Sequence, residues 1–204
     1  MTRERLTAFT DGVLAVIITI MVLEMKPPHG ADLAALSALW PVFLSYALSF
    51  VYVAIYWNNH HHFFQLVERV DGAILWANLH LLFWLSLIPF ATAWMGENHN
   101  APLPTALYGV SLLMPAIAWP LMQAAIIRSQ GPDSPLRRAL GADLKGKISP
   151  AVYLAGVGLS FVSPLIADLL YLAGALMWLV PDRRVEAALA GEGTGEGAGE
   201  GAQP

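Results

Sequence analysis

The sequence predicts an all-α integral membrane protein with six transmembrane helices. Hydrophobic residues make up 56 % of the 204 residues, charged residues make up only 13 %, and the mean hydropathy is +0.55. A soluble domain carries about 25 % charged residues, so this chain has too few charges to cover a water-facing surface. The apolar residues also form stretches that match the ~20 helical residues needed to cross the ~30 Å hydrocarbon core of a bilayer.

Six apolar stretches define the expected helices. The first four cover Leu6–Met25, Leu36–Trp57, Ala73–Met95 and Thr105–Ile127. The last apolar block is too long for one span, and Ser163-Pro164 divides it, because proline disfavours helix in the residue before it and has no N–H to donate. We therefore expect a fifth helix over Ile148–Val162 and a sixth over Pro164–Val180, joined by a tight turn.

The basic residues set the expected orientation. With six spans, the two termini and the segments 58–72 and 128–147 share one side of the membrane; every Lys and Arg except Lys26 lies in these segments. An excess of Lys and Arg marks the cytoplasmic side of a membrane protein, so both termini are predicted to be cytoplasmic. The N-terminal segment is expected to be retained, because Glu24 follows its apolar core directly and no small-residue cleavage site is present there.

The chain divides into an expected six-helix channel domain, residues 1–182, and a cytoplasmic tail, residues 183–204. The end of the tail, Gly191–Pro204, is rich in Gly and Glu, with no basic residue and no side chain able to drive packing, which predicts a disordered acidic segment. The absence of cysteine excludes disulfides, thiol catalysis and Cys-based zinc sites. No basic face indicates nucleic-acid binding.

The first helix is the most informative element. Its uninterrupted apolar stretch, Gly12–Leu23, is ~18 Å long at 1.5 Å per residue, and Asp11 and Glu24 bound it. Because a charge inside hydrocarbon is costly, we expect other helices or a water-filled path to shelter this helix. A tilted helix in a locally thinned bilayer is the alternative.

One face of the first helix carries an aliphatic stripe, Val16, Ile20 and Leu23, at i, i+4 and i+7, with Thr19 beside it. Such a stripe is usual in plain helix packing, but aliphatic rings around a symmetry axis also gate pores by expelling water. In a pore, Thr19 would be the hydroxyl that contacts a partly dehydrated ion. Its alternative role is a hydrogen bond back to the carbonyl of Ala15.

The segment Arg5-Leu6-Thr7-Ala8-Phe9-Thr10-Asp11-Gly12 resembles the Arg-x-x-x-Phe-Ser-Asp signature of the transmembrane-protein-175 family of potassium channels, with Thr10 in place of the usual serine. The resemblance continues through Thr19, Val22-Leu23-Glu24, Pro27, Ser49-Phe50, Trp57-Asn58-Asn59-His60-His61, Asn78-Leu79 and Pro89-Phe90-Ala91-Thr92. It covers the chain from about Arg5 to Thr92. The later helices agree mainly in number and length.

This resemblance implies a homotetramer in which the first helix of each subunit lines a central pore. It places a hydrophobic constriction at Val16, Ile20 and Leu23 and a threonine layer implicated in ion preference at Thr19. The Thr-Val-Gly-Tyr-Gly filter of ordinary potassium channels is absent from the sequence. We therefore expect a potassium-permeable, weakly selective cation channel of the bacterial inner (plasma) membrane. It would need no cofactor, and its partners would be other copies of itself, lipid and monovalent cations.

Polar residues near the cytoplasmic ends of the first three helices are expected to anchor the first helix to the others, because buried polar groups in a membrane must find partners. The members of this expected network are Arg5, Phe9, Thr10, Asp11, Trp57, His60 and Asn78. Snorkelling of Arg5 and an interfacial position for Trp57 are the alternative.

The run His60-His61-His62 raises the question of a metal site. Consecutive residues of a helix point in different directions, so we expect none, and cytoplasmic pH sensitivity is another role open to these histidines. The sequence contains no His-Glu-x-x-His, Gly-x-Ser-x-Gly or phosphate-binding glycine loop, so an enzyme is not expected. Two alternatives to a potassium channel remain. One is a proton-conducting channel or secondary transporter using Asp11, Glu24 and the histidines; the other is a structural membrane protein without transport.

Overall fold

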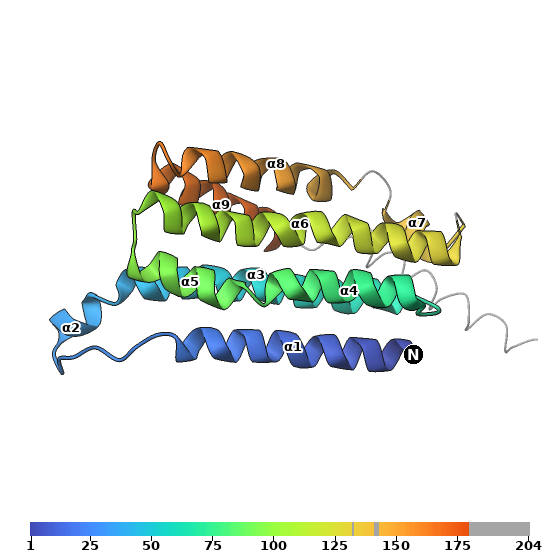
Figure 1. Cartoon of the computed structure of the whole chain (residues 1–204), viewed down its shortest axis with the longest axis horizontal. Helices are drawn as coiled ribbons and strands as arrows, with labels where there is room; N and C mark the ends of the chain where they lie inside the picture. The colour runs from blue at the N-terminus through green and yellow to red at the C-terminus, as the bar shows by residue number, and fades with distance from the viewer. Residues whose placement is uncertain (132, 141–142, 180–204) are drawn as a thin grey trace, which may run out of the picture.

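The computed structural model describes residues 1–131, 133–140 and 143–179, and within them all regular structure is helical. The tail expected for residues 183–204 lies outside the described residues. The long helices run side by side along the longest axis of the molecule (Figure 1). Helix α1 (Arg3–Leu23) lies at one edge of the bundle, and α8 (Leu144–Leu159) lies near the opposite edge.

Helix α1 begins three residues before the expected start at Leu6. The hydroxyl of Thr2 accepts a hydrogen bond from the backbone N–H of Arg5, and this N-cap satisfies one of the free donors of the first turn. The helix ends at Leu23, two residues before the expected Met25. Pro27 and Pro28 follow closely, and proline disfavours helix in the residue before it.

The second expected helix is divided into the short α2 (Leu33–Ser37) and the long α3 (Trp40–Gln65). Proline at position 41 occupies the first turn of α3, where its missing N–H costs no helical bond. The expected end at Trp57 is wrong, because α3 continues to Gln65 through the polar residues 58–62. Hydropathy locates the apolar part of a helix, whereas the backbone hydrogen bonds continue regardless of side-chain polarity.

The third expected helix, Ala73–Met95, is also interrupted, at residues 86–87, between α4 (Gly72–Leu85) and α5 (Ile88–Glu97). Proline at position 89 opens α5 and cannot donate the backbone bond that would continue α4. Asp71 caps α4. Hydrogen bonds from the Ser129 hydroxyl and from the Ile74 N–H lower the pKa of Asp71 below its usual value.

Helix α6 (Pro102–Gln130) extends three residues beyond both ends of the expected Thr105–Ile127. It packs against α4, α5, α8 and α9, so it forms the centre of the bundle. It ends at Gly131, whose φ of +96° lies in the left-handed region that favours glycine.

The short α7 (Pro135–Leu140), α8 and α9 (Pro164–Leu179) complete the described helices. The expected division at Ser163-Pro164 is confirmed, since α9 begins at Pro164. The fifth expected helix is displaced, because α8 starts at Leu144 and ends at Leu159. The carboxylate of Asp143 sets this earlier start by accepting a hydrogen bond from the N–H of Gly146 at 3.2 Å. Residue 180, the expected end of the sixth helix, lies outside the described residues.

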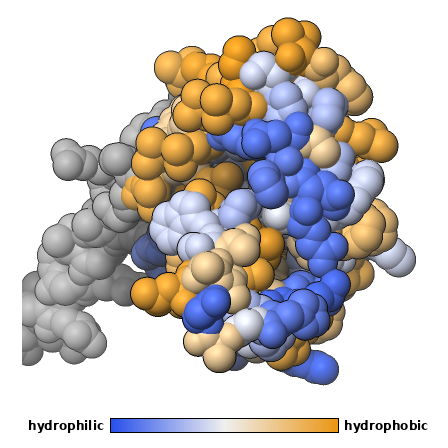
Figure 2. Space-filling model, turned by 90° about the vertical axis from the view of Figure 1, so that its left-hand side faces the viewer, coloured by the Kyte–Doolittle hydropathy of each residue, from blue (hydrophilic) through white to orange (hydrophobic). Residues whose placement is uncertain are grey.

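Four helical segments in the described part of the chain are long and apolar enough to cross a membrane: Arg3–Leu23, Trp40–Gln65, Gly72–Glu97 and Pro102–Gln130, while α9 is a shorter apolar helix. Figure 2 views the end of the molecule where α2 and the α8–α9 turn lie; hydrophilic residues form a band down this end, and hydrophobic residues surround it. Exposed leucines, including Leu165, Leu169 and Leu172, continue along α9. Apolar sides with a polar end are typical of a protein embedded in lipid.

The buried residues form two hydrophobic clusters. The first joins α1 to α3, α4 and α6. The middle of α1 contributes Leu14, Ile17 and Met21 to it. The second joins α3, α5, α6, α8 and α9 around four tyrosines, Tyr52, Tyr108, Tyr153 and Tyr171. Among the described residues, helix α1 contributes only to the first cluster, and a large part of its remaining surface is exposed.

Candidate functional site

Helix α1 has one buried face and one exposed face. The buried face consists of Leu6, Thr10, Leu14, Ile17 and Met21. The stripe predicted from the sequence lies on the other side, with exposed fractions of 55 % for Val16, 41 % for Ile20 and 78 % for Leu23. A single copy of the chain therefore leaves about half or more of each of these aliphatic side chains uncovered by the described residues, apart from Ile20, which is slightly less exposed.

The exposed side of α1 and the neighbouring α5 border a groove of about 890 Å³. Val16 and Ile20 line one wall, and Phe90 and Trp94, whose ring centroids are 6.3 Å apart, line the other. At one end of the groove the ammonium of Lys26 lies 2.8 Å from a carboxylate oxygen of Glu97. The hydrogen bond to Glu97 and the charge of that carboxylate raise the pKa of Lys26 above its usual value.

Thr19 is exposed beside the stripe. Its hydroxyl donates to the carbonyl of Val16 at 2.9 Å, so the bond lies three positions back and not at Ala15, the acceptor considered as the alternative. A hydroxyl that donates its proton in this way keeps its oxygen lone pairs available to another donor or to a cation.

Thr10, Asn78 and His60 form a buried hydrogen-bonded chain that connects α1, α4 and α3. The side-chain N–H of Asn78 donates to the Thr10 hydroxyl at 2.9 Å, and the Asn78 carbonyl oxygen lies 2.9 Å from Nε2 of His60. This arrangement assigns the imidazole proton to Nε2. The three residues are 0 to 1 % exposed, and the His60 ring stacks on Phe64 at a centroid distance of 4.2 Å.

A second polar contact holds α1 one residue further along. The indole N–H of Trp57 donates to the carboxylate of Asp11 at 3.0 Å. Two consecutive residues of α1, Thr10 and Asp11, are thus bonded to side chains of neighbouring helices. Because unpartnered polar groups are costly in a membrane, these bonds fix the rotation of α1 about its axis.

Two members of the expected network lie outside this cluster. The exposed side chain of Arg5 forms no hydrogen bond or ion pair with the described part of the chain. Phe9 lines the groove between α1 and α5 and is 49 % exposed. Sequence reasoning missed the basic residue that does connect helices: the guanidinium of Arg3 donates to the Gln65 carbonyl at 3.1 Å, joining the start of α1 to the end of α3.

Sequence reasoning also missed a second polar cluster, formed by hydroxyl groups among the tyrosines. The hydroxyl of Ser49 donates to Tyr108 at 3.0 Å and lies 2.7 Å from the hydroxyl of Thr92. The Tyr52 hydroxyl donates to the backbone carbonyl of Tyr171. The signal available in the sequence was a set of Ser, Thr and Tyr residues inside apolar stretches, which hydropathy averages away.

No group of three or more His, Asp or Glu side chains that could hold a metal ion occurs within the residues described. The neighbouring histidines have different contacts. His60 is buried against Asn78, whereas His61 lies 3.0 Å from the side-chain nitrogen of Gln65 and stacks on Trp57.

Comparison with known proteins places this arrangement in a family. The family model described as endosomal/lysosomal potassium channel TMEM175 matches residues 5–89. A potassium channel of a Chryseobacterium species is 54 % identical over 189 residues, which cover 93 % of this chain and 98 % of the relative. The chain belongs to the TMEM175 family. The TMEM175 match includes the stripe on α1, the Thr10–Asn78–His60 chain and the Asp11–Trp57 contact.

This chain aligns with other TMEM175 relatives over different shares of their length. A potassium channel of Streptomyces collinus is 33 % identical, and the aligned region covers 78 % of this chain and 82 % of the relative. The crystal structure of a lysosomal potassium-selective channel TMEM175 homolog from Chamaesiphon minutus matches with a TM-score of 0.76 at 29 % identity, over 88 % of this chain and 97 % of that chain. The human endosomal/lysosomal proton channel TMEM175 is 32 % identical, but the chain spans only 25 % of it.

Proposed function

We propose that four copies of this chain form a potassium-permeable, weakly selective cation channel in a bacterial inner membrane, with six spans per subunit and both termini cytoplasmic. The observation that carries the proposal is the exposed aliphatic stripe on α1. Away from this stripe, Thr10 and Asp11 of the same helix are hydrogen-bonded to the rest of the bundle. Four α1 helices around an axis cover one another and turn each stripe residue into a ring. The bacterial relatives named potassium channels support this function.

In this proposal the narrowest part of the pore is apolar. Val16, Ile20 and Leu23 extend over about 10 Å of helix and form three stacked collars. A potassium ion stripped of water would cross such a collar only at a high energetic cost, so conduction depends on how readily water fills the rings. Thr19 supplies a hydroxyl near the collars and would influence which ion passes most easily.

We assign the anchoring of the pore helix to Thr10, Asp11, Trp57, His60 and Asn78. Their contacts join α1 to α3 and α4, which are themselves packed into the bundle. Arg5 and Phe9 are left out of this assignment, because their side chains lie apart from these hydrogen bonds. The anchored helix holds its stripe at a fixed angle to the pore axis.

A recording from the purified chain in a lipid bilayer with unequal potassium and sodium tests the proposal. We expect cation current with a modest preference for potassium, and a higher resting conductance with blunted selectivity in Ile20→Asn. Ile18→Asn is the control, because Ile18 is half-buried against the core. If Ile18→Asn increased the conductance and Ile20→Asn did not, the wrong face of α1 would have been assigned to the pore.

Thr19→Val tests the ion-preference role separately. The two side chains have nearly the same shape, but valine lacks the hydroxyl. The relative permeability of potassium, rubidium and sodium should change while the conductance in pure potassium stays close to that of the wild type. Unchanged permeability ratios would remove Thr19 from the proposal.

A proton channel is the second candidate, because the vertebrate relatives are named endosomal/lysosomal proton channels. Asp11 and Glu24 at the two ends of the apolar part of α1 are the carboxylates this candidate would use. The reversal potential under a pH gradient, with equal potassium on both sides, separates the two candidates. A shift toward the proton equilibrium potential would favour the proton channel.

A further inference from the structure

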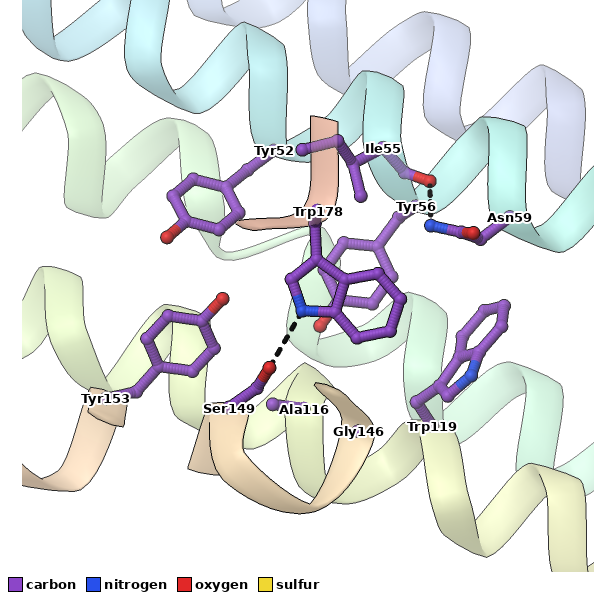
Figure 3. A pocket seen from close by; sticks show the side chains of 10 residues that line it. All are labelled: Tyr52, Ile55, Tyr56, Asn59, Ala116, Trp119, Gly146, Ser149, Tyr153 and Trp178. Atoms are coloured by element: carbon purple, nitrogen blue, oxygen red, sulfur yellow. Dashed lines mark hydrogen bonds between the residues drawn. The ribbon is translucent and has the colours of Figure 1, made fainter. Parts of the chain in front are cut away.

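A small cavity lies where α3, α6, α8 and α9 meet. Its volume is about 40 Å³. Aromatic rings form most of its wall (Figure 3), and they belong to Tyr52, Tyr56, Trp119, Tyr153 and Trp178. Because α1 contributes no residue to this wall, the cavity is separate from the exposed stripe proposed to line the pore.

The indole of Trp178 is fixed as one wall of the cavity. Its N–H donates to the hydroxyl of Ser149 at 2.7 Å, which ties the end of α9 to α8. Ser149 in turn donates to the carbonyl of Lys145 at 2.8 Å, so its own hydrogen-bonding needs are met. Figure 3 shows this hydrogen bond and the indole between Tyr153 and Trp119.

Two polar groups in the wall have unused hydrogen-bonding capacity, and both belong to α3. The hydroxyl of Tyr56 forms no hydrogen bond with the residues that the structure describes, although its ring is held edge-to-face against Trp119 at 6.0 Å. The side-chain N–H of Asn59 donates to the Ile55 carbonyl at 2.9 Å, which leaves the Asn59 oxygen as an acceptor. A phenol and an amide oxygen one helical turn apart suit a ligand that carries a hydroxyl group.

The charges around the cavity favour a neutral ligand. Among the described residues, no Asp or Glu lines the wall. Gly146, also in the wall, belongs to the first turn of α8, where the helix dipole is positive, and this disfavours a cation. An anion would have to leave water for a wall made mostly of aromatic and aliphatic carbon, which is costly.

The size of the cavity limits the ligand further. A water molecule needs roughly 10–15 Å³ of such volume, so the space suits a molecule of about three or four non-hydrogen atoms. We propose that this cavity binds small neutral alcohols. The alcohol hydroxyl bonds to Tyr56 and Asn59, and its carbon atoms pack against the rings of Trp119, Tyr153 and Trp178. Trp119 also belongs to the hydrophobic cluster that contains α1, so the bound molecule touches the core that supports the pore helix.

The test uses 2-fluoroethanol as a probe, followed by fluorine NMR, with the purified full chain in detergent. Wild-type protein should give a saturable bound signal. Ala116→Leu fills the cavity and should abolish that signal, and Tyr56→Phe removes the hydroxyl and should weaken binding about fivefold, the loss of one hydrogen bond. Ala173→Leu, on the exposed side of α9, is the matched control and should bind as the wild type does.

Equal and non-saturable signals from all four proteins would show that the probe only partitions into detergent, and would overturn the proposal. Crystals grown with 2-bromoethanol give a second measurement. An anomalous bromine peak inside the cavity supports the site, whereas density for water alone contradicts it. If Ala116→Leu does not fold, Tyr56→Phe and the bromine peak decide the outcome. Neither measurement uses ion current, so failure of this proposal and failure of the channel function are distinguishable.

Discussion

The two hydrophobic clusters use polar side chains in different ways. Around α1 a single amide, Asn78, bonds to one residue of α1 and to one of α3, so three helices meet at one side chain. Around the four tyrosines the phenols belong to a tightly interlocked aromatic core, in which Gly109 and Gly156 leave the space that Tyr171 fills. Helix α1 is therefore held on one face only, by a few hydrogen bonds and an apolar stripe, whereas α8 and α9 are held by hydrogen bonds together with the close fit of the tyrosine rings. A helix of the first kind is suited to line a pore.

The largest effect is expected from Asn78→Ala, which removes the shared partner of the α1 cluster. The Thr10 hydroxyl and the His60 N–H would both be left buried without partners, at about 1–3 kcal/mol each. We expect the free energy of unfolding in detergent to fall by roughly 2–6 kcal/mol. Asn98→Ala is the control, because the exposed side chain of Asn98 bonds to the Trp94 carbonyl of the adjoining helix α5 and to no other helix among the described residues. Similar losses in the two variants would show that the buried chain has no special role.

An intermediate effect is expected in the tyrosine cluster, where shape matters more than hydrogen bonds. In Gly109→Ala the added methyl group would overlap Tyr171 and Val157, and such overpacking costs about 1–3 kcal/mol. Gly158→Ala adds the same group where no atom lies within 4 Å. It should stabilise α8 by up to about 1 kcal/mol, because alanine favours helix more than glycine does. Thermal unfolding followed by tryptophan fluorescence should therefore shift in opposite directions, and two shifts of the same sign would contradict this packing.

The smallest effect is expected at Asp71, which caps α4 in the first cluster and bonds to Ser129 of α6. Because these bonds lower its pKa, its contribution to stability is present above the unfolded value of 3.8 and is lost as the pH falls through the lower folded value. Asp71→Asn keeps a capping side chain but removes the charge. The unfolding temperature of the wild type should exceed that of the variant at pH 7, and the difference should shrink steadily as the pH falls below 3.8. A difference that stays constant as the pH is lowered further would exclude the charge as its cause.

The sequence predicts the helical stretches well because apolar length reports directly on contact with lipid. It predicts their ends poorly. The start of α1 depends on the Thr2 cap, and α3 continues to Gln65 through polar residues that hydropathy excludes. The break between α4 and α5 depends on Pro89, whose effect a hydropathy window averages away.

Among the candidate site residues, the sequence alone indicated which were polar and near one end of the bundle. It could not indicate which of them meet. Arg3 bonds to the end of α3 while Arg5 stays exposed, and this choice depends on the rotation of α1 about its axis. Likewise Lys26 and Glu97 pair across 71 positions of the chain, a contact that only the folded arrangement creates.

The interruption at residues 86–87 has a mechanical consequence. Helix α4 carries Asn78, which holds α1, and α5 carries Phe90 and Trp94, which face α1 across the groove. A continuous helix would behave as one stiff rod, so any tilt at the groove would pull on the bond to Thr10. The proline-induced break acts as a joint between two shorter rods. The backbone hydrogen bonds that stiffen the groove wall in α5 are therefore separate from those that stiffen α4, where Asn78 holds α1.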